Sequence, residues 1–169
     1  MQKNQFKKLN NEQLAYLAGF LEADGCFLVQ IVPGARYRYK HTIRISIVFY
    51  QKKDKHWYFL QLKNLIGVGI IRFRKDEMLE YTITGLGLVN KFLEMLFPYL
   101  ILKKNLAVLI FRIIRGLNDV KDEAGFLEVC KLVDKVADHT YSKKRKNTSL
   151  TVKNSLLLPV ETEEVDASR

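Results

Sequence analysis

The chain has 169 residues, 48% of them hydrophobic, so it can bury a core and is not a disordered tail. With 28 Lys and Arg against 18 Asp and Glu, its net charge of +10 indicates a polyanionic partner, although a basic protein without one is the alternative. No CxxC spacing, signal peptide or membrane-length apolar run is present. We therefore expect no zinc site, no membrane contact and an intracellular, non-secreted protein.

The first expected helix opens near Asn10, which can form a capping box with Gln13. Small residues recur every four positions along it, at Ala15, Gly19 and Ala23. Such a stripe lets another backbone approach closely. The helix ends at Asp24 and Gly25, and we expect Gly25 to leave it through a positive φ. Because a helix C-terminus is already negative, Asp24 and the neighbouring carbonyls indicate a cation site, the alternative being a buried helix with an acidic last turn.

The later elements follow from periodicity and from breakers. Strands are expected over 26–32, 41–50, 69–74 and 78–84, and helices over 54–66, 86–97, 104–117, 124–137 and about 148–158. Asp54 is the expected N-cap of the second helix. The order predicts an α+β fold with a four-stranded antiparallel sheet and an αββαββα core. We expect one domain over 1–158, with its core at 10–118 and a helical part at 119–158, before a frayed acidic tail at 159–169.

Clean alternation in 41–50 gives the sheet one apolar and one wet face. Arg and Tyr residues in the link at 35–40 suit contact with phosphates and sugars. The basic run at 143–146 suits the same contact. The alternatives are a solvated sheet face and a flexible basic linker.

The nine residues Leu17 to Gly25 resemble the LAGLIDADG motif of homing endonucleases and depart from it at Phe20, Leu21 and Glu22. The order of elements over roughly 10–155 is similar to the single-motif branch of that family, encoded in ribosomal RNA introns. One motif per chain implies a homodimer, because a second copy of the stripe supplies the matching surface. The expected contact residues are Ala15, Ala18, Gly19 and Ala23.

The resemblance also implies the chemistry of the site. Asp24 would bind a divalent metal with the Ala23 carbonyl, and oxygen ligands favour Mg²⁺. Mn²⁺ is expected to substitute, and Ca²⁺ to support binding without cleavage. Gln51 matches the amide that positions water, Lys103 matches the active-site lysine, and Lys55 stands where the family often has Arg. Glu22 is expected to be structural.

Double-stranded DNA with a long pseudo-palindromic site is the partner that the resemblance implies, with no small-molecule substrate. The expected DNA-binding residues are Gln30, Arg36, Tyr37, Arg38, Lys40, Arg44, Ser46, Tyr50, Arg72, Arg74, Glu80, Thr82, Ser142, Lys143 and Lys146.

The implied function is a site-specific endonuclease that hydrolyses both strands across the minor groove, leaves short 3′ overhangs and promotes intron mobility. It would act in the cytoplasm or nucleoid of a prokaryote, or in an organelle. A binding protein of the same fold is the first alternative, either an RNA maturase or a DNA-binding protein that does not cleave. A basic ribosomal-type RNA binder is a further alternative, although it needs neither the acid–glycine end nor the stripe.

Overall fold

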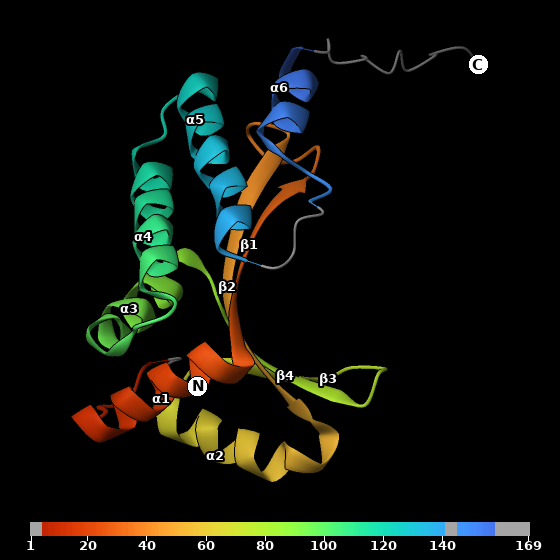
Figure 1. Ribbon diagram of the computed structural model, residues 1–169. Helices are drawn as coiled ribbons and strands as arrows, with labels where there is room; N and C mark the ends of the chain where they lie inside the picture. Colours follow the sequence, from red (N-terminus) through yellow and green to blue (C-terminus); the bar gives the residue numbers. More distant parts are fainter. Residues whose placement is uncertain (1–4, 141–144, 158–169) are drawn as a thin grey trace.

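The computed structural model describes residues 5–140 and 145–157 (Figure 1). Its helices and strands run in the order α1 (Asn11–Asp24), β1 (Gly25–Pro33), β2 (His41–Lys52), α2 (His56–Ile66), β3 (Ile70–Phe73), β4 (Met78–Thr84), α3 (Leu86–Leu96), α4 (Lys104–Asp119), α5 (Glu123–Asp134) and α6 (Ser149–Leu157). Short 3-10 turns η1 (Lys53–Lys55), η2 (Phe97–Tyr99) and η3 (Lys135–His139) join some of them. The strands form one antiparallel sheet in the order β1-β2-β4-β3, which confirms the α+β prediction.

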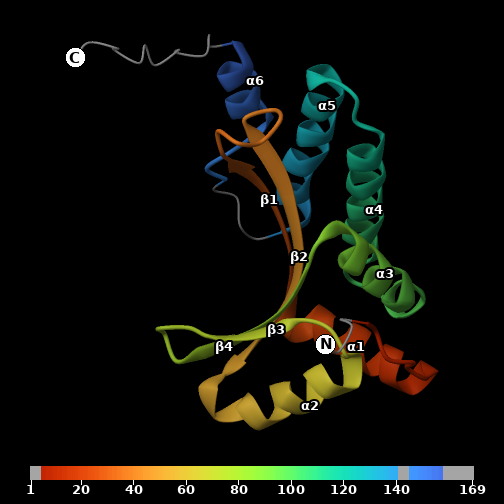
Figure 2. The same cartoon turned by 180° about the vertical axis from the view of Figure 1, so that it is seen from behind.

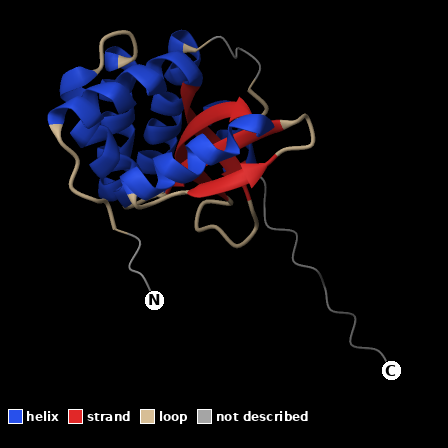
Figure 3. Cartoon of the chain, turned by 90° about the horizontal axis from the view of Figure 1, so that it is seen from below, coloured by secondary structure: helices blue, strands red, loops and turns tan. Residues whose placement is uncertain are grey.

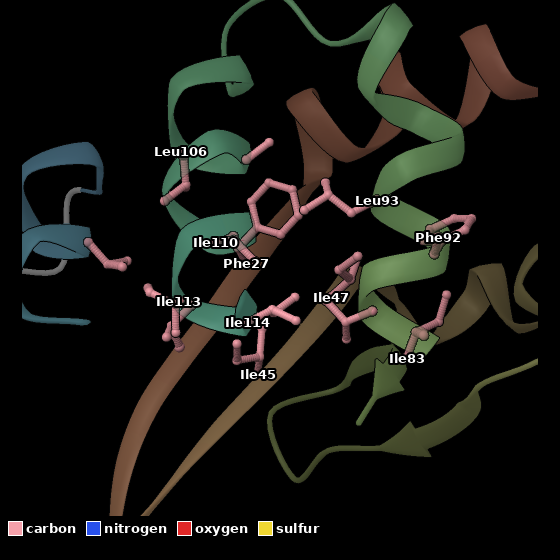
Figure 4. Packing of buried hydrophobic residues seen from close by; sticks show 14 of the residues in the cluster. Phe27, Ile45, Ile47, Ile83, Phe92, Leu93, Leu106, Ile110, Ile113 and Ile114 are labelled. Carbon is pink, nitrogen blue, oxygen red and sulfur yellow. The ribbon is translucent and has the colours of Figure 1, made fainter. Parts of the chain in front are cut away.

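The sheet keeps one face for the core, and the opposite face is here called the open face. The predicted alternation in β2 holds at Arg44, which is exposed on the open face, but not at Ser46 and Val48, which are 7% and 2% exposed. Ile45, Ile47 and Phe49 are almost completely buried on the core face. Side chains of α3 and α4 point toward β1 and β2 in the close view of this core (Figure 4). Most helices gather on one side of the strands when the molecule is seen from below (Figure 3).

The C-terminal helices share this core. Phe126 of α5 stacks on Tyr39 beside the β1–β2 loop, with ring centroids 4.8 Å apart, and Val152 of α6 is fully buried. In contrast, the β3–β4 hairpin projects away from α3 and α4 in two opposite views (Figures 1 and 2). In the part of the chain that the structure describes, no helix has the length and apolar character that crossing a bilayer requires.

Three local predictions are wrong at element boundaries. Asp54 does not cap α2, because the Lys53 N–H donates to the Glu77 carbonyl (2.9 Å) and holds the chain in a 3-10 turn until His56. Arg74 lies in the β3–β4 turn rather than in a strand. The expected helix at 124–137 ends as α5 at Asp134 and continues as η3.

Candidate active site

The capping box of α1 forms as predicted, with the Asn10 side chain accepting from the Gln13 N–H at 2.8 Å. Its other end differs from the prediction, because Gly25 is extended (φ −109, ψ 166) and opens β1 without a loop. Glycine is required here for space rather than for positive φ. A Cβ at Gly25 would lie 2.9 Å from both the Cα and the carbonyl oxygen of Leu21. Strand β1 therefore leaves the helix so sharply that Asp24 stays exposed at the corner.

Gln51 meets Asp24 at this corner. The pairing of Gly25 with Phe49 brings the end of β2 beside the end of α1. From there the Gln51 Nε2 donates to Asp24 Oδ2 at 2.8 Å. The amide fixes the orientation of the carboxylate and occupies one side of one oxygen. The structure thus joins two of the predicted catalytic residues across 27 positions of sequence.

Lys103 closes the C-terminal end of α1. Its Nζ donates to the carbonyl oxygens of Leu21 (2.7 Å), Glu22 (3.0 Å) and Gly25 (2.6 Å). Burial lowers the pKa of this ammonium, while Cys26, Glu22 and Asp24 act in the opposite direction. The carbonyls that indicated a cation site therefore receive a protein cation, and the Asp24 carboxylate lies outside that set of contacts.

Glu22 holds Lys103 in place, in agreement with its predicted structural role. Its Oε1 accepts from the backbone N–H of Ile101 (2.7 Å) and of Lys103 (3.0 Å) at the start of α4. Each side chain thus binds backbone of the other segment, and this reciprocal contact fixes α1 against α4.

Lys55 does not join this group. Its Nζ pairs with the adjacent carboxylate of Asp54 at 2.9 Å, and both side chains are exposed. Sequence spacing placed Lys55 four residues after Gln51, but η1 turns the chain between them. A role for Lys55 in the reaction therefore needs a movement of its side chain.

Within the described residues, no three His, Cys, Asp or Glu side chains gather into a cluster that could hold a metal ion. The oxygen donors at the corner are the exposed Asp24 carboxylate and the adjacent Ala23 carbonyl, which suit a hard divalent cation. These two groups are too few to complete the coordination shell of such a cation within the described part of one subunit.

The small-residue stripe lies on the exposed side of α1. Ala15, Gly19 and Ala23 are exposed, and a Cβ at Gly19 would meet no atom within 4 Å. Ala18 does not belong to this surface, because it is 0% exposed within its own subunit. The helical repeat directs Ala18 to the core together with Leu17 and Leu21.

On the open face, the predicted DNA-binding residues form a charged group around β4. Arg74 pairs with Glu80 (2.8 Å) and Asp76 (3.0 Å), and its guanidinium lies 5.9 Å from the ring centre of Tyr50. Burial, followed by the neighbouring Cys26, raises the pKa of Tyr50 to about 12. Its hydroxyl is therefore a neutral hydrogen-bonding group at physiological pH.

Other predicted readers of this face have different outcomes. Gln30 and Arg44 are exposed and directly opposite each other on β1 and β2. The prediction that Ser46 contacts DNA directly is wrong, because Ser46 is 7% exposed and its hydroxyl donates to Thr84 Oγ1 at 2.9 Å. Its position mid-sheet, between strands on both sides, hides a side chain this short.

Two basic residues of the link between β1 and β2 donate hydrogen bonds to the backbone of the C-terminal segment of their own subunit. Arg38 donates to the Lys121 carbonyl before α5, and Lys40 donates to the Ser155 carbonyl of α6, both at 3.0 Å. Arg36 and Tyr37 are exposed. The sequence identified these basic residues but gave no sign that two of them donate to backbone carbonyls more than 80 residues away, one in the α4–α5 loop and one in α6.

Ser142 and Lys143 lie outside the described residues. Lys146 is exposed, whereas Arg145 is half-buried and donates to the Val29 carbonyl at 3.1 Å. Asn147 donates to the Ile31 carbonyl at 3.0 Å. Burial lowers the pKa of Arg145. Sequence reasoning missed both contacts, which fasten the C-terminal segment along the outer edge of β1.

A family model described as LAGLIDADG endonuclease matches residues 17–115, more than half of the chain. The chain therefore belongs to the LAGLIDADG endonuclease family, as the motif and the order of elements predicted.

Two relatives are similar over most of their length. The DNA endonuclease I-CreI of Chlamydomonas reinhardtii is 39% identical over 147 residues, covering 86% of this chain and 90% of that protein. The DNA endonuclease I-CvuI of Chlorella vulgaris is 38% identical over 133 residues, covering 79% of this chain and 83% of that protein. A crystal structure of I-CvuI with uncleaved I-CreI target in 2 mM Mg matches with a TM-score of 0.81 at 36% identity, covering 86% of this chain and 92% of that one.

Proposed function

We propose that this protein is a homodimeric, site-specific homing endonuclease that hydrolyses both strands of DNA with a divalent metal. The observation that carries the proposal is the Gln51–Asp24 hydrogen bond at the end of an exposed small-residue stripe. A binding protein needs neither an oriented, exposed carboxylate nor a helix end already neutralised by Lys103. The names of the relatives I-CreI and I-CvuI, both DNA endonucleases, support the same reaction.

Two copies would meet through the exposed stripe of α1. An isologous contact there brings the two Asp24 carboxylates close to the two-fold axis. At about 5 Å and an effective dielectric of about 20, their repulsion is roughly 3 kcal/mol, which a shared cation relieves. This charge accounts for a metal requirement that one subunit does not satisfy alone.

The metal-binding residues of each subunit would be Asp24 and the Ala23 carbonyl. When bound, Mg²⁺ lowers the pKa of a coordinated water and neutralises charge on the leaving 3′ oxygen. We propose that Mn²⁺ substitutes and that Ca²⁺ supports binding without cleavage. The oxygen donor set fits all three ions. Complexes of I-CvuI with DNA in the presence of Mg or Ca support divalent ions at this fold.

The remaining residues would orient Asp24 and water and balance the charge of the site. Gln51 holds Asp24 and can direct a water with the rest of its amide. Lys103 places a positive charge beside the corner and keeps the end of α1 against α4. Lys55 would leave Asp54 to contact a phosphate once DNA is bound.

Recognition would use the open face of the sheet in the major groove, one subunit per half of a long pseudo-palindromic site. Gln30, Arg44, Arg72 and Arg74 would contact base edges. Lys146 would contact phosphate. Cleavage across the minor groove with short 3′ overhangs, intron mobility and an intracellular site of action complete the proposal.

A nicking assay tests this function. A plasmid library with randomised inserts is incubated with the protein in Mg²⁺, in Ca²⁺ and in EDTA, and linear products are sequenced. We expect cleavage at one related set of sites in Mg²⁺ and none in Ca²⁺ or EDTA. Sequence-selective binding without cleavage in Mg²⁺ or Mn²⁺ would instead indicate the non-cleaving alternative.

A further inference from the structure

The open face of the sheet carries two neighbouring rows of paired residues that differ in chemistry. The strand register places one row across all four strands, here called the apolar row: Cys26, Val48, Thr82 and Ile70. The next row, here called the charged row, contains Tyr50, Glu80 and Arg72. Residues directly opposite each other share a face of a sheet, so both rows face the same side.

Accessible apolar surface in the apolar row belongs mainly to Ile70. Its side chain is 49% exposed on the edge strand β3, whereas Val48, two strands away, is 2% exposed. Thr82 lies between them, half-buried. Ile70 therefore presents an aliphatic surface that the sheet supports from one side and that the described part of its own subunit leaves about half exposed.

The charged row and its neighbours indicate which kind of partner binds this surface. Arg72 lies two residues from Ile70 on the same face, and Arg74 is held beside it by Glu80 at 2.8 Å. A net charge of +10 favours a polyanion over an apolar protein partner at such a face. In the major groove of DNA, the C5-methyl group of thymine is the apolar feature that base edges present.

We infer that Ile70 is a specificity-determining residue that packs on a thymine methyl group in each half-site. The inference rests on the proposed function and extends base reading to a residue without polar atoms in its side chain. The inference also fixes the spacing between this thymine and the base pair that Arg72 contacts. Residues two apart on a strand are separated by about 6.8 Å, the rise of about two base pairs. The thymine therefore lies about two base pairs from the position that Arg72 reads.

Deoxyuridine substitution tests the contact, because it removes the methyl group and leaves base pairing unchanged. The probe is a duplex that the wild-type protein selects from a randomised pool in Ca²⁺, and the Arg72-dependent position is located with Arg72→Ala. Each thymine is then replaced singly and affinity is measured by fluorescence anisotropy. For the wild type we expect about fourfold weaker binding at one position per half-site, the effect of one buried methyl group. With Ile70→Ala, the same replacement should have no effect.

Val108→Ala is the matched control, because Val108 is a β-branched side chain 44% exposed on α4. It should keep the wild-type response to deoxyuridine. Two outcomes would overturn this inference and leave the proposed function standing. One is an equal loss of affinity on deoxyuridine substitution in the wild type and in Ile70→Ala. The other is a half-site in which no thymine about two base pairs from the Arg72 position depends on its methyl group. Cleavage of the selected duplex in Mg²⁺ tests the proposed function separately. A protein that selects no sequence would overturn both.

Discussion

The Lys103 ammonium occupies three carbonyl oxygens at the end of α1, and this changes what Asp24 can do. A carboxylate at a helix C-terminus faces the negative end of the helix dipole. Here that end is neutralised by the half-buried Lys103 ammonium, while Gln51 fixes one carboxylate oxygen at 2.8 Å. Asp24 remains exposed and oriented, so its charge is available to an external cation.

Asp24→Asn should therefore separate binding from chemistry. The amide keeps the shape of the corner but removes a charge that the metal requires, so cleavage should fall by several orders of magnitude. DNA affinity in Ca²⁺ or without metal should hold or improve, because a negative charge beside the phosphates is gone. Single-turnover cleavage and equilibrium binding measure the two effects. Cleavage at the wild-type rate would show that Asp24 is only a helix-end residue.

Lys103→Met should affect stability as well as rate. Three carbonyl oxygens lose a charged donor, so we expect the free energy of unfolding to fall by about 2–4 kcal/mol. Cleavage should slow less than in Asp24→Asn, because Lys103 balances charge without holding the metal. Urea unfolding measures the first effect. Lys104→Met is the control and should change stability by less than about 1 kcal/mol, since the exposed Lys104 has its ammonium over the ring of Phe97, 5.2 Å from the ring centre, and such a contact contributes little at an exposed site.

Helix α1 presents two different surfaces at the scale of an element. Leu17, Ala18 and Leu21 fill the core of their own subunit. The opposite stripe, Ala15, Gly19 and Ala23, is exposed and flat because its side chains are small or absent. A flat helix surface of this kind lets a second helix come close enough for backbone contact.

Gly19→Leu should break dimerisation and activity together. The new side chain meets open space in its own subunit but overpacks a helix seam between two subunits. Analytical ultracentrifugation should show a folded monomer, with cleavage lost in parallel. Gly87→Leu is the matched control, because Gly87 lies in helix α3 and its Cβ would also meet open space. A fully active Gly19→Leu monomer would contradict the two-fold model.

The whole molecule divides into a helical side and an open sheet face. Most of the helices gather on one side of the strands (Figure 3), while the β3–β4 hairpin extends away from α3 and α4 (Figure 1). The C-terminal segment adds Lys146 beside β1, fastened there by Arg145 and Asn147. A net charge of +10 over such a surface favours DNA binding driven largely by phosphate contacts.

Binding should accordingly weaken steeply with salt. The slope of log K against log salt concentration should correspond to on the order of ten neutralised phosphates per dimer. Lys146→Ala should lower affinity similarly for all sequences and reduce the slope by about one unit per subunit. Titrations at several salt concentrations measure both. A slope near zero would contradict a phosphate-dominated interface.

Arg72→Ala should act differently from Lys146→Ala. Arg72 is exposed in the charged row of the sheet, where a guanidinium can bind a guanine edge. Its removal should relax base preference at one position per half-site, measured by selection from a randomised pool. A uniform loss of affinity for every sequence would show that Arg72 is not a base reader.

Local signals in the sequence were enough for most of the fold. The capping box of α1, the alternation in β2 and the polar turn before β4 depend on neighbours a few residues apart, and each element formed within a few residues of its predicted bounds. The motif from Leu17 to Gly25 likewise identified the family, because it is contiguous.

The tertiary structure decided which side chains are free to act. Ser46 and Ala18 have suitable chemistry but are buried, and burial depends on strands and helices that pack from elsewhere. Arg38, Lys40 and Arg145 read as phosphate contacts, yet each donates to a carbonyl brought near by folding. By itself, the sequence determined the elements, the net charge and the position of Asp24 at the end of the motif. Long-range packing determined which charges remain available, because a hydrogen bond between residues 80 apart leaves no local pattern.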